Sequence, residues 1–129
     1  MRKQYHLRPS ERGLLAWDVD RLVALTAGLT RVWVPLTEIT ELDEPYWFGG
    51  GASEATCRAV AEHARLIAEV DLLYPIILSP DGRVMDGMHR VARALLDGRG
   101  EVEAVRLPAE PEPDFVGVPI DELPYDEAV

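Results

Sequence analysis

The sequence has one cysteine, Cys57, among 129 residues, and it lacks any long apolar run. One thiol can form neither a disulfide within the chain nor a cysteine-based zinc cluster, so we expect a protein of the reducing cytoplasm. No segment approaches the roughly 18 apolar residues of a membrane span, and the basic first residues lead into no apolar stretch of signal-peptide length. We therefore expect no membrane span and no export signal.

Positive charge is also scarce, since 13 Lys and Arg face 23 Asp and Glu, for a formal net charge of -10. A field of this sign repels nucleic acid and anionic membrane surfaces, which argues against DNA as a partner. A small anion is still allowed, because a few backbone N–H groups and one arginine can reverse the potential locally. The charge balance thus disfavours polyanions and leaves nucleotides open.

The length fits one domain, and the 47% hydrophobic content is ordinary for a protein with one core. The patterns below predict a single α+β domain in which helices pack on a small mixed sheet. We divide the chain into an N-terminal helical extension (1–30), a central domain (31–107), and an acidic, proline-rich linker with a C-terminal segment (108–129). The linker should be extended and solvated.

The first third of the chain contains one helical and one strand-like pattern. Apolar residues at helical spacings predict a helix after Ser10, with Ser10 or Asp18 as its cap and Gly28 as its end. A short strand follows at 31–36, in which Pro35 must lie at the end or on a sheet edge.

The segment 43–52 combines large aromatic residues with three consecutive glycines, which favours a loop over a helix or strand. Its aromatic side chains either cover an edge of the core or form a substrate lid with glycine hinges. A helix capped by Ser53 should then run to about Val70. The aromatic residues of the loop are Tyr46, Trp47 and Phe48.

The segment 74–107 has the clearest pattern. A short aliphatic strand at 75–78, a proline- and glycine-containing turn at 79–82 and a return strand at 83–85 predict a hairpin. A helix should follow from about Met88 to Asp97 and end at Gly98, and the alternation in 101–107 predicts a half-buried strand.

The sequence Asp86-Gly87-Met88-His89-Arg90 joins the predicted hairpin to this helix. Glycine lets the backbone leave the strand sharply, and the next N–H groups open a helix without backbone partners, which favours an anion. Arg90 offers a planar fork for phosphate oxygens, His89 is a donor near neutral pH, and Arg93 is a second cation one turn on. His89 and Arg93 are also consistent with ordinary surface positions.

Asp86 has two interpretations. A carboxylate beside a phosphate site opposes binding unless it coordinates Mg²⁺ or accepts a proton from an attacking hydroxyl. Aspartate is also one of the best helix N-caps, so Asp86 could simply cap the helix that follows.

The central part of the chain, from about Val32 to Leu107, resembles the ParB/sulfiredoxin superfamily of nucleotide-binding domains. The likeness is sharpest in the hairpin and in the run from Asp86 to Gly98. It implies a ParB/sulfiredoxin-like fold in which Gly87, the following N–H groups and Arg90 bind the phosphates of ATP, ADP or CTP. Met88 stands where sulfiredoxins have their catalytic cysteine, which argues against that chemistry. Only about 30 residues, with many acidic side chains among them, follow Gly98, where chromosome-partitioning members continue into a helix-turn-helix.

The loop motif is most similar to that of the free-serine kinases, whose Asp-Gly-x-His-Arg matches Asp86, Gly87, His89 and Arg90. That resemblance implies a catalytic acidic residue after the opening strand and turn. The chain is shorter than those enzymes. The acidic residues in the corresponding region are Glu41, Asp43 and Glu44.

Three functions follow as hypotheses. The first is a cytoplasmic kinase that binds a nucleotide with Mg²⁺ at Asp86 and transfers phosphate to a small hydroxylated molecule. The second is a non-catalytic regulatory module with a protein partner on the aromatic loop, where residues favoured at binding hot spots gather. DNA binding or nuclease activity ranks last because the chain is acidic.

Overall fold

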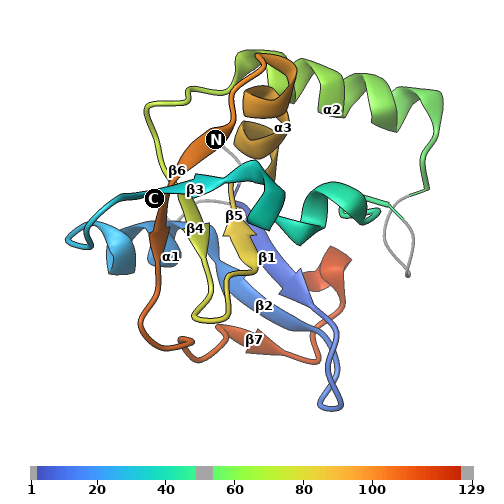
Figure 1. The fold of residues 1–129 in the computed structure, drawn as a ribbon. Coiled ribbons are helices and arrows are strands. Elements are labelled where there is room, and N and C mark those ends of the chain that lie inside the picture. Colours follow the sequence, from blue (N-terminus) through green and yellow to red (C-terminus); the bar gives the residue numbers. More distant parts are fainter. Residues whose placement is uncertain (1–2, 49–53, 126–129) are drawn as a thin grey trace.

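A four-stranded mixed sheet forms the centre of the protein, in a computed structural model that describes residues 3–48 and 54–125 (Figure 1). The strand order is β3-β6-β4-β5; β6 runs antiparallel to β3 and parallel to β4, and β4 and β5 form an antiparallel hairpin. These strands are β3 (Val32–Pro35), β4 (Ile76–Leu78), β5 (Val84–Asp86) and β6 (Glu101–Arg106).

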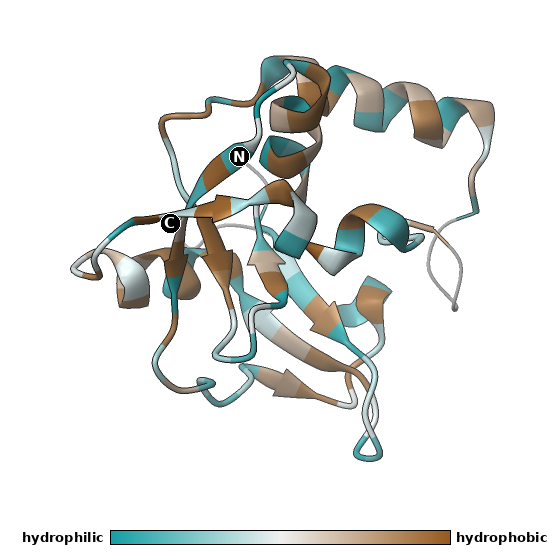
Figure 2. Ribbon diagram, in the orientation of Figure 1, coloured by the Kyte–Doolittle hydropathy of each residue, from teal (hydrophilic) through white to brown (hydrophobic). Residues whose placement is uncertain are grey.

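Both faces of this sheet are covered. Successive side chains of a strand point to opposite faces, so Ile76 and Leu78 enter one core while Ile77 enters the other. Helices α2 (Cys57–Glu69) and α3 (Met88–Leu96) lie on the first side, and α1 (Val19–Thr26) lies on the second (Figure 1). Coverage of both faces explains why β4 is hydrophobic along its whole length (Figure 2).

A second sheet of three antiparallel strands, in the order β1-β2-β7, packs on the same side as α1. The strands are β1 (Tyr5–Arg8), β2 (Leu15–Asp18) and β7 (Phe115–Val116). The prediction of a helical N-terminal extension was therefore wrong for Leu15–Asp18, which form a buried strand. Local helical spacing lost to pairing with two neighbours and to burial of Trp17, which is 0% exposed. Asp18 is the N-cap of α1, as one of the two alternatives had it.

The proline-rich linker is extended and largely exposed, as expected, but it is anchored to the domain. The indole Nε1 of Trp17 donates to the carbonyl of Pro111 (2.8 Å), and the N–H of Asp114 donates to the carbonyl of Ala16 (2.8 Å). These bonds lead the chain into β7, so the segments 1–30 and 108–129 share one sheet instead of forming separate appendages.

The predictions for the central segment were confirmed in their main elements. The hairpin, α3 and β6 occur where the pattern placed them, and the short turns η1 (Leu36–Glu38) and η2 (Thr40–Asp43) follow β3. The N-cap of α2 is Thr56, whereas the predicted Ser53 lies outside the described residues. The last turn is η3 (Ile120–Glu122).

Pro35 lies both at the end of a strand and on an edge. Leu36 donates its N–H to the carbonyl of Gly100, just before β6 (3.0 Å), and Pro35 lies opposite Glu101 in the register. Hydrogen-bonded positions alternate along an antiparallel ladder, so Pro35 turns its backbone toward the free edge, where a missing N–H costs nothing.

The two sheets and three α-helices make up one small α+β domain, as the sequence predicted. In the part of the chain that the structure describes, no helix combines the length and the apolar character needed to cross a bilayer.

Candidate functional site

Gly87 makes the turn from β5 into α3 and is the N-cap of that helix, with a φ of 101°. A side chain here would be strained, and a Cβ would lie 2.8 Å from both Nη2 of Arg90 and Cγ2 of Ile76. No side chain caps α3, so the interpretation of Asp86 as the N-cap was wrong. The first N–H groups of α3 keep the partial positive charge of an uncapped helix start.

The Asp86 carboxylate instead pairs with the guanidinium of Arg90, one helical turn ahead (Oδ2 to Nη2, 3.0 Å). Nη2 also donates to the carbonyl of Pro75, 3.2 Å away, which draws the arginine back over Gly87. Among the buried side-chain nitrogen and oxygen atoms of the described residues, only Nε of Arg90 lacks a hydrogen-bond partner. A buried donor without an acceptor is costly and marks a position where an oxygen ligand is favoured.

A shallow pocket of about 120 Å³ opens beside this ion pair. Ligand sites for whole drug-sized molecules usually measure about 300–1,000 Å³, so this one accepts a single group of a larger ligand. Apart from the charged pair, its lining is mostly apolar. The lining residues are Val23, Thr26, Tyr74, Pro75, Ile77, Asp86 and Arg90.

His89 faces α2 and the aromatic segment. Its Nε2 lies 2.8 Å from Nδ1 of His63, and the angle between the two ring planes is 21°. The two nitrogens therefore share one N–H···N hydrogen bond. The indole of Trp47 lies parallel to both rings, with each pair of ring centroids 4.5 Å apart. His63 and Trp47 thus fix the His89 ring, and no local spacing in the sequence signalled this contact.

This packing makes the two histidines harder to protonate. Burial, the neighbouring His63 and the positive charge of Arg90 together lower the pKa of His89 to about 4. Burial also lowers the pKa of His63, although Glu62 opposes the shift. At neutral pH the pair is therefore uncharged and shares a single bridging proton.

We expect the protein to lose stability as the pH falls from about 6.5 toward about 4. In that window the unfolded chain binds more protons than the folded one, so each depressed histidine pKa contributes stability that disappears on acidification. Urea unfolding midpoints at about pH 7.5 and about pH 4.5 measure the loss.

A paired variant, His63→Gln with His89→Gln, should shrink the acid-induced loss. His6, whose pKa burial also lowers to about 4, accounts for a remaining part, which His6→Gln removes separately. An unchanged pH profile in the paired variant would contradict the assignment to these rings.

Arg93 contacts the C-terminal end of α2, away from the Gly87 turn. Its Nη1 donates to the carbonyl of Ala68 (2.6 Å), and its Nε pairs with Asp97 (3.1 Å). It therefore satisfies a carbonyl at the C-terminal end of α2, where cations are stabilising, and the structure does not bring it to the Gly87 turn.

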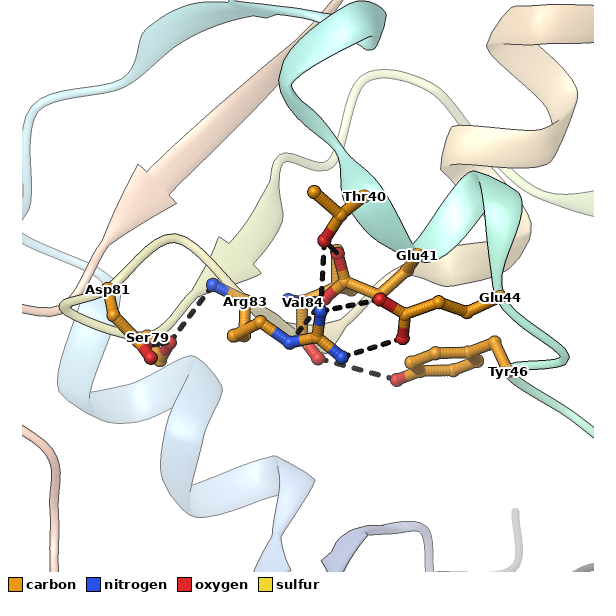
Figure 3. A network of polar contacts seen from close by, with 8 residues as sticks. All are labelled: Thr40, Glu41, Glu44, Tyr46, Ser79, Asp81, Arg83 and Val84. Atoms are coloured by element: carbon orange, nitrogen blue, oxygen red, sulfur yellow. Dashed lines mark hydrogen bonds and ion pairs between the residues drawn. The ribbon is translucent and has the colours of Figure 1, made fainter. Parts of the chain in front are cut away.

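Glu41 is 2% exposed and is bound to the edge strand β5 (Figure 3). Its carboxylate accepts the N–H of Val84 and lies 3.6 Å from Nε of Arg83, while the Tyr46 hydroxyl donates to the carbonyl of Val84 at 3.4 Å. Two side chains thus form hydrogen bonds with the N–H and the carbonyl of Val84, in the place of a neighbouring strand. The sequence did not indicate a role for Arg83, because only the folded structure brings this residue next to Glu41 of η2 and Glu44.

Glu44 and Asp43 differ from Glu41 in exposure. Both guanidinium ends of Arg83 donate to the Glu44 carboxylate at 2.8 Å, and these bonds hold the pKa of Glu44 below its usual range (Figure 3). Asp43 is exposed. Of the three acidic candidates, two are therefore engaged by one arginine.

Tyr46 is affected by the charges of both Glu41 and Asp86. Burial, followed by the negative charges of Glu41 and Asp86, raises the pKa of its phenol to about 12. The phenol therefore lies within the electrostatic reach of both carboxylates, although the two carboxylates do not contact each other.

No group of three or more His, Cys, Asp or Glu side chains within residues 3–48 and 54–125 is arranged to hold a metal ion. Asp86 is a single carboxylate, which suits Mg²⁺ only when substrate phosphates complete the coordination. Comparison with protein-family models, curated proteins and solved structures finds no match.

Proposed function

We propose that this protein is a cytoplasmic nucleotide-binding domain of the ParB/sulfiredoxin type, with the phosphates held at the start of α3. The observation that carries the proposal is the partnerless, buried Nε above Gly87 on Arg90, a residue that also lines the pocket. The order β3, η1, α2, hairpin, α3 and β6 is also the order that the resemblance implies.

Arg90 binds phosphate by exchanging its partner. In the structure the Asp86 carboxylate takes one guanidinium nitrogen, and a phosphate has the oxygen geometry to take Nε and Nη2 together. The uncapped N–H groups of Met88 and His89 add donors from the backbone. Asp86, once released, would be the residue to hold a Mg²⁺ ion, which would supply positive charge beside the phosphates.

Titration with ATP, ADP and CTP, with and without Mg²⁺, tests binding. A ligand at a hundred times its dissociation constant should stabilise the fold by about 2.7 kcal/mol. Arg90→Lys keeps the charge but removes the fork, and should abolish most of the stabilisation. Arg99→Gln is the control, because Arg99 is an exposed cation just beyond the same helix. Absence of any nucleotide effect on the unaltered protein, or an equal effect in Arg90→Lys, would refute the proposal.

Phosphate transfer to a small hydroxylated molecule is the second candidate, favoured by the position of Asp86 against Arg90 at the pocket. Asp86 would act as the Mg²⁺ ligand or the base, and Asp43 is the acidic residue of its segment that Arg83 does not engage. Nucleotide consumption with L-serine and related alcohols measures this activity. Turnover equal to that of Asp86→Asn would exclude it and leave a binding module.

A protein partner on the aromatic segment is the alternative for such a module. The indole of Trp47 packs flat on two histidines and is half-buried. A partner protein could therefore contact only part of this side chain. The contacts within the chain therefore favour a structural role for Trp47.

A further inference from the structure

The turn at 71–75, between α2 and β4, combines a fixed backbone with exposed side chains. Asp71 accepts the N–H of Leu73 through Oδ1 (2.9 Å) and the N–H of Tyr74 through its carbonyl (3.3 Å). Arg31 donates to the carbonyl of Leu73 (3.0 Å). Arg90 donates to the carbonyl of Pro75, at the end of the same turn.

Despite this bracing, the side chains of the turn are not packed. Tyr74 is 64% exposed and Leu73 is 78% exposed, and Val23 of α1 across the pocket is 51% exposed. Tyr74 and Val23 both line the pocket that Asp86 and Arg90 close. Single exposed apolar residues are common, but here an aromatic ring on a rigid backbone borders a small apolar pocket beside an arginine.

We propose that Tyr74 is the surface on which the base of a bound nucleotide stacks, an inference that rests on the proposed nucleotide function. The phosphates lie at Gly87 and Arg90, and the base lies over the Tyr74 ring at the mouth of the pocket. Every nucleobase presents a flat π-face, and an aromatic side chain on a backbone that is already fixed binds it without the entropic cost of ordering that backbone.

The charge pattern of the pocket agrees with this division. Its charged groups are Asp86 at the end of β5 and Arg90 on α3, and apart from Thr26 its remaining wall is mostly apolar. A ligand with a polyanionic end and an uncharged aromatic end matches that arrangement, whereas inorganic polyphosphate uses only the Arg90 side.

The experiment compares two probes on the full chain, a nucleoside triphosphate (ATP, or CTP if it binds more tightly) and inorganic tripolyphosphate. Tyr74→Ala should weaken nucleotide binding by roughly 5- to 150-fold, the range for losing one base stack, and should leave tripolyphosphate binding unchanged. Tyr74→Phe keeps the ring and should bind like the unaltered protein. Leu73→Ala is the matched control, because it removes another exposed apolar side chain of the same turn.

The outcomes separate the two proposals. If the unaltered protein binds neither probe, both the nucleotide function and the stacking role fall. Nucleotide binding that Tyr74→Ala leaves intact overturns the stacking role alone. An equal loss of both probes in Tyr74→Ala also overturns it, because the tyrosine then acts on the phosphate site through Pro75 and not on the base.

Discussion

Glu41→Ala should lower the free energy of unfolding by about 2–4 kcal/mol, because it removes a charged acceptor from a buried backbone donor. Glu41 is 2% exposed, and its carboxylate holds the N–H of Val84 on the outer edge of β5. Without the carboxylate that N–H has no acceptor nearby, and the methyl group of alanine leaves a void in the core. Arg83 is not stranded, since Glu44 still binds it and it faces solvent.

Two milder substitutions test whether this loss of stability comes from the buried N–H of Val84. Glu41→Gln retains an oxygen for the Val84 N–H and should cost less than half as much as the alanine variant. Glu44→Gln removes the charge from the exposed partner of the same Arg83 and should cost much less than the alanine variant of Glu41. Urea unfolding with a shared m-value measures all three variants. Equal costs for Glu41→Ala and Glu44→Gln would show that the buried N–H does not matter.

Gly87→Ala is the second large effect, and we expect the free energy of unfolding to fall by about 3 kcal/mol, together with loss of the nucleotide binding that we propose. The φ of 101° at Gly87 is costly for any residue with a Cβ. The Cβ of alanine would also lie 2.8 Å from Nη2 of Arg90 and 2.8 Å from the buried Ile76 side chain. Arg90 can move aside only by giving up its bonds to Asp86 and Pro75.

Gly98→Ala separates backbone strain from crowding. Gly98 ends α3 with a φ of 73°, but a Cβ there would meet nothing within 4 Å. It should therefore show the strain alone, about 1–2 kcal/mol, and unaltered ligand binding. Thermal or urea unfolding gives the two costs. If Gly87→Ala costs no more than Gly98→Ala, the close approach of Arg90 is not a constraint.

The sequence predicted the segment from Ile76 to Arg106 nearly element by element, because its signals are local. The turn at 79–82 fixes the hairpin, glycines bound α3, and the alternation in β6 reflects the two cores on its faces. The sheet edge for Pro35 was also predictable, since a missing N–H is a property of the residue itself.

The N-terminal segment was less predictable because its structure depends on distant partners. Leu15–Asp18 have apolar residues that suit a helix, yet they pair with β1 and with β7 from the far end of the chain. The burial of Trp17 and two ladders of hydrogen bonds outweigh a weak local preference.

For the candidate site, the sequence by itself determined the Gly87 turn and the presence of an arginine one turn into α3, since both follow from glycine's backbone freedom and helical spacing. Only the tertiary structure decided which way each polar side chain turns. Arg90 folds back to Pro75, Arg93 goes to the end of α2, and His89 meets His63 under Trp47. Long side chains reach whichever acceptor the packed elements bring near, and that depends on contacts between residues far apart in the chain.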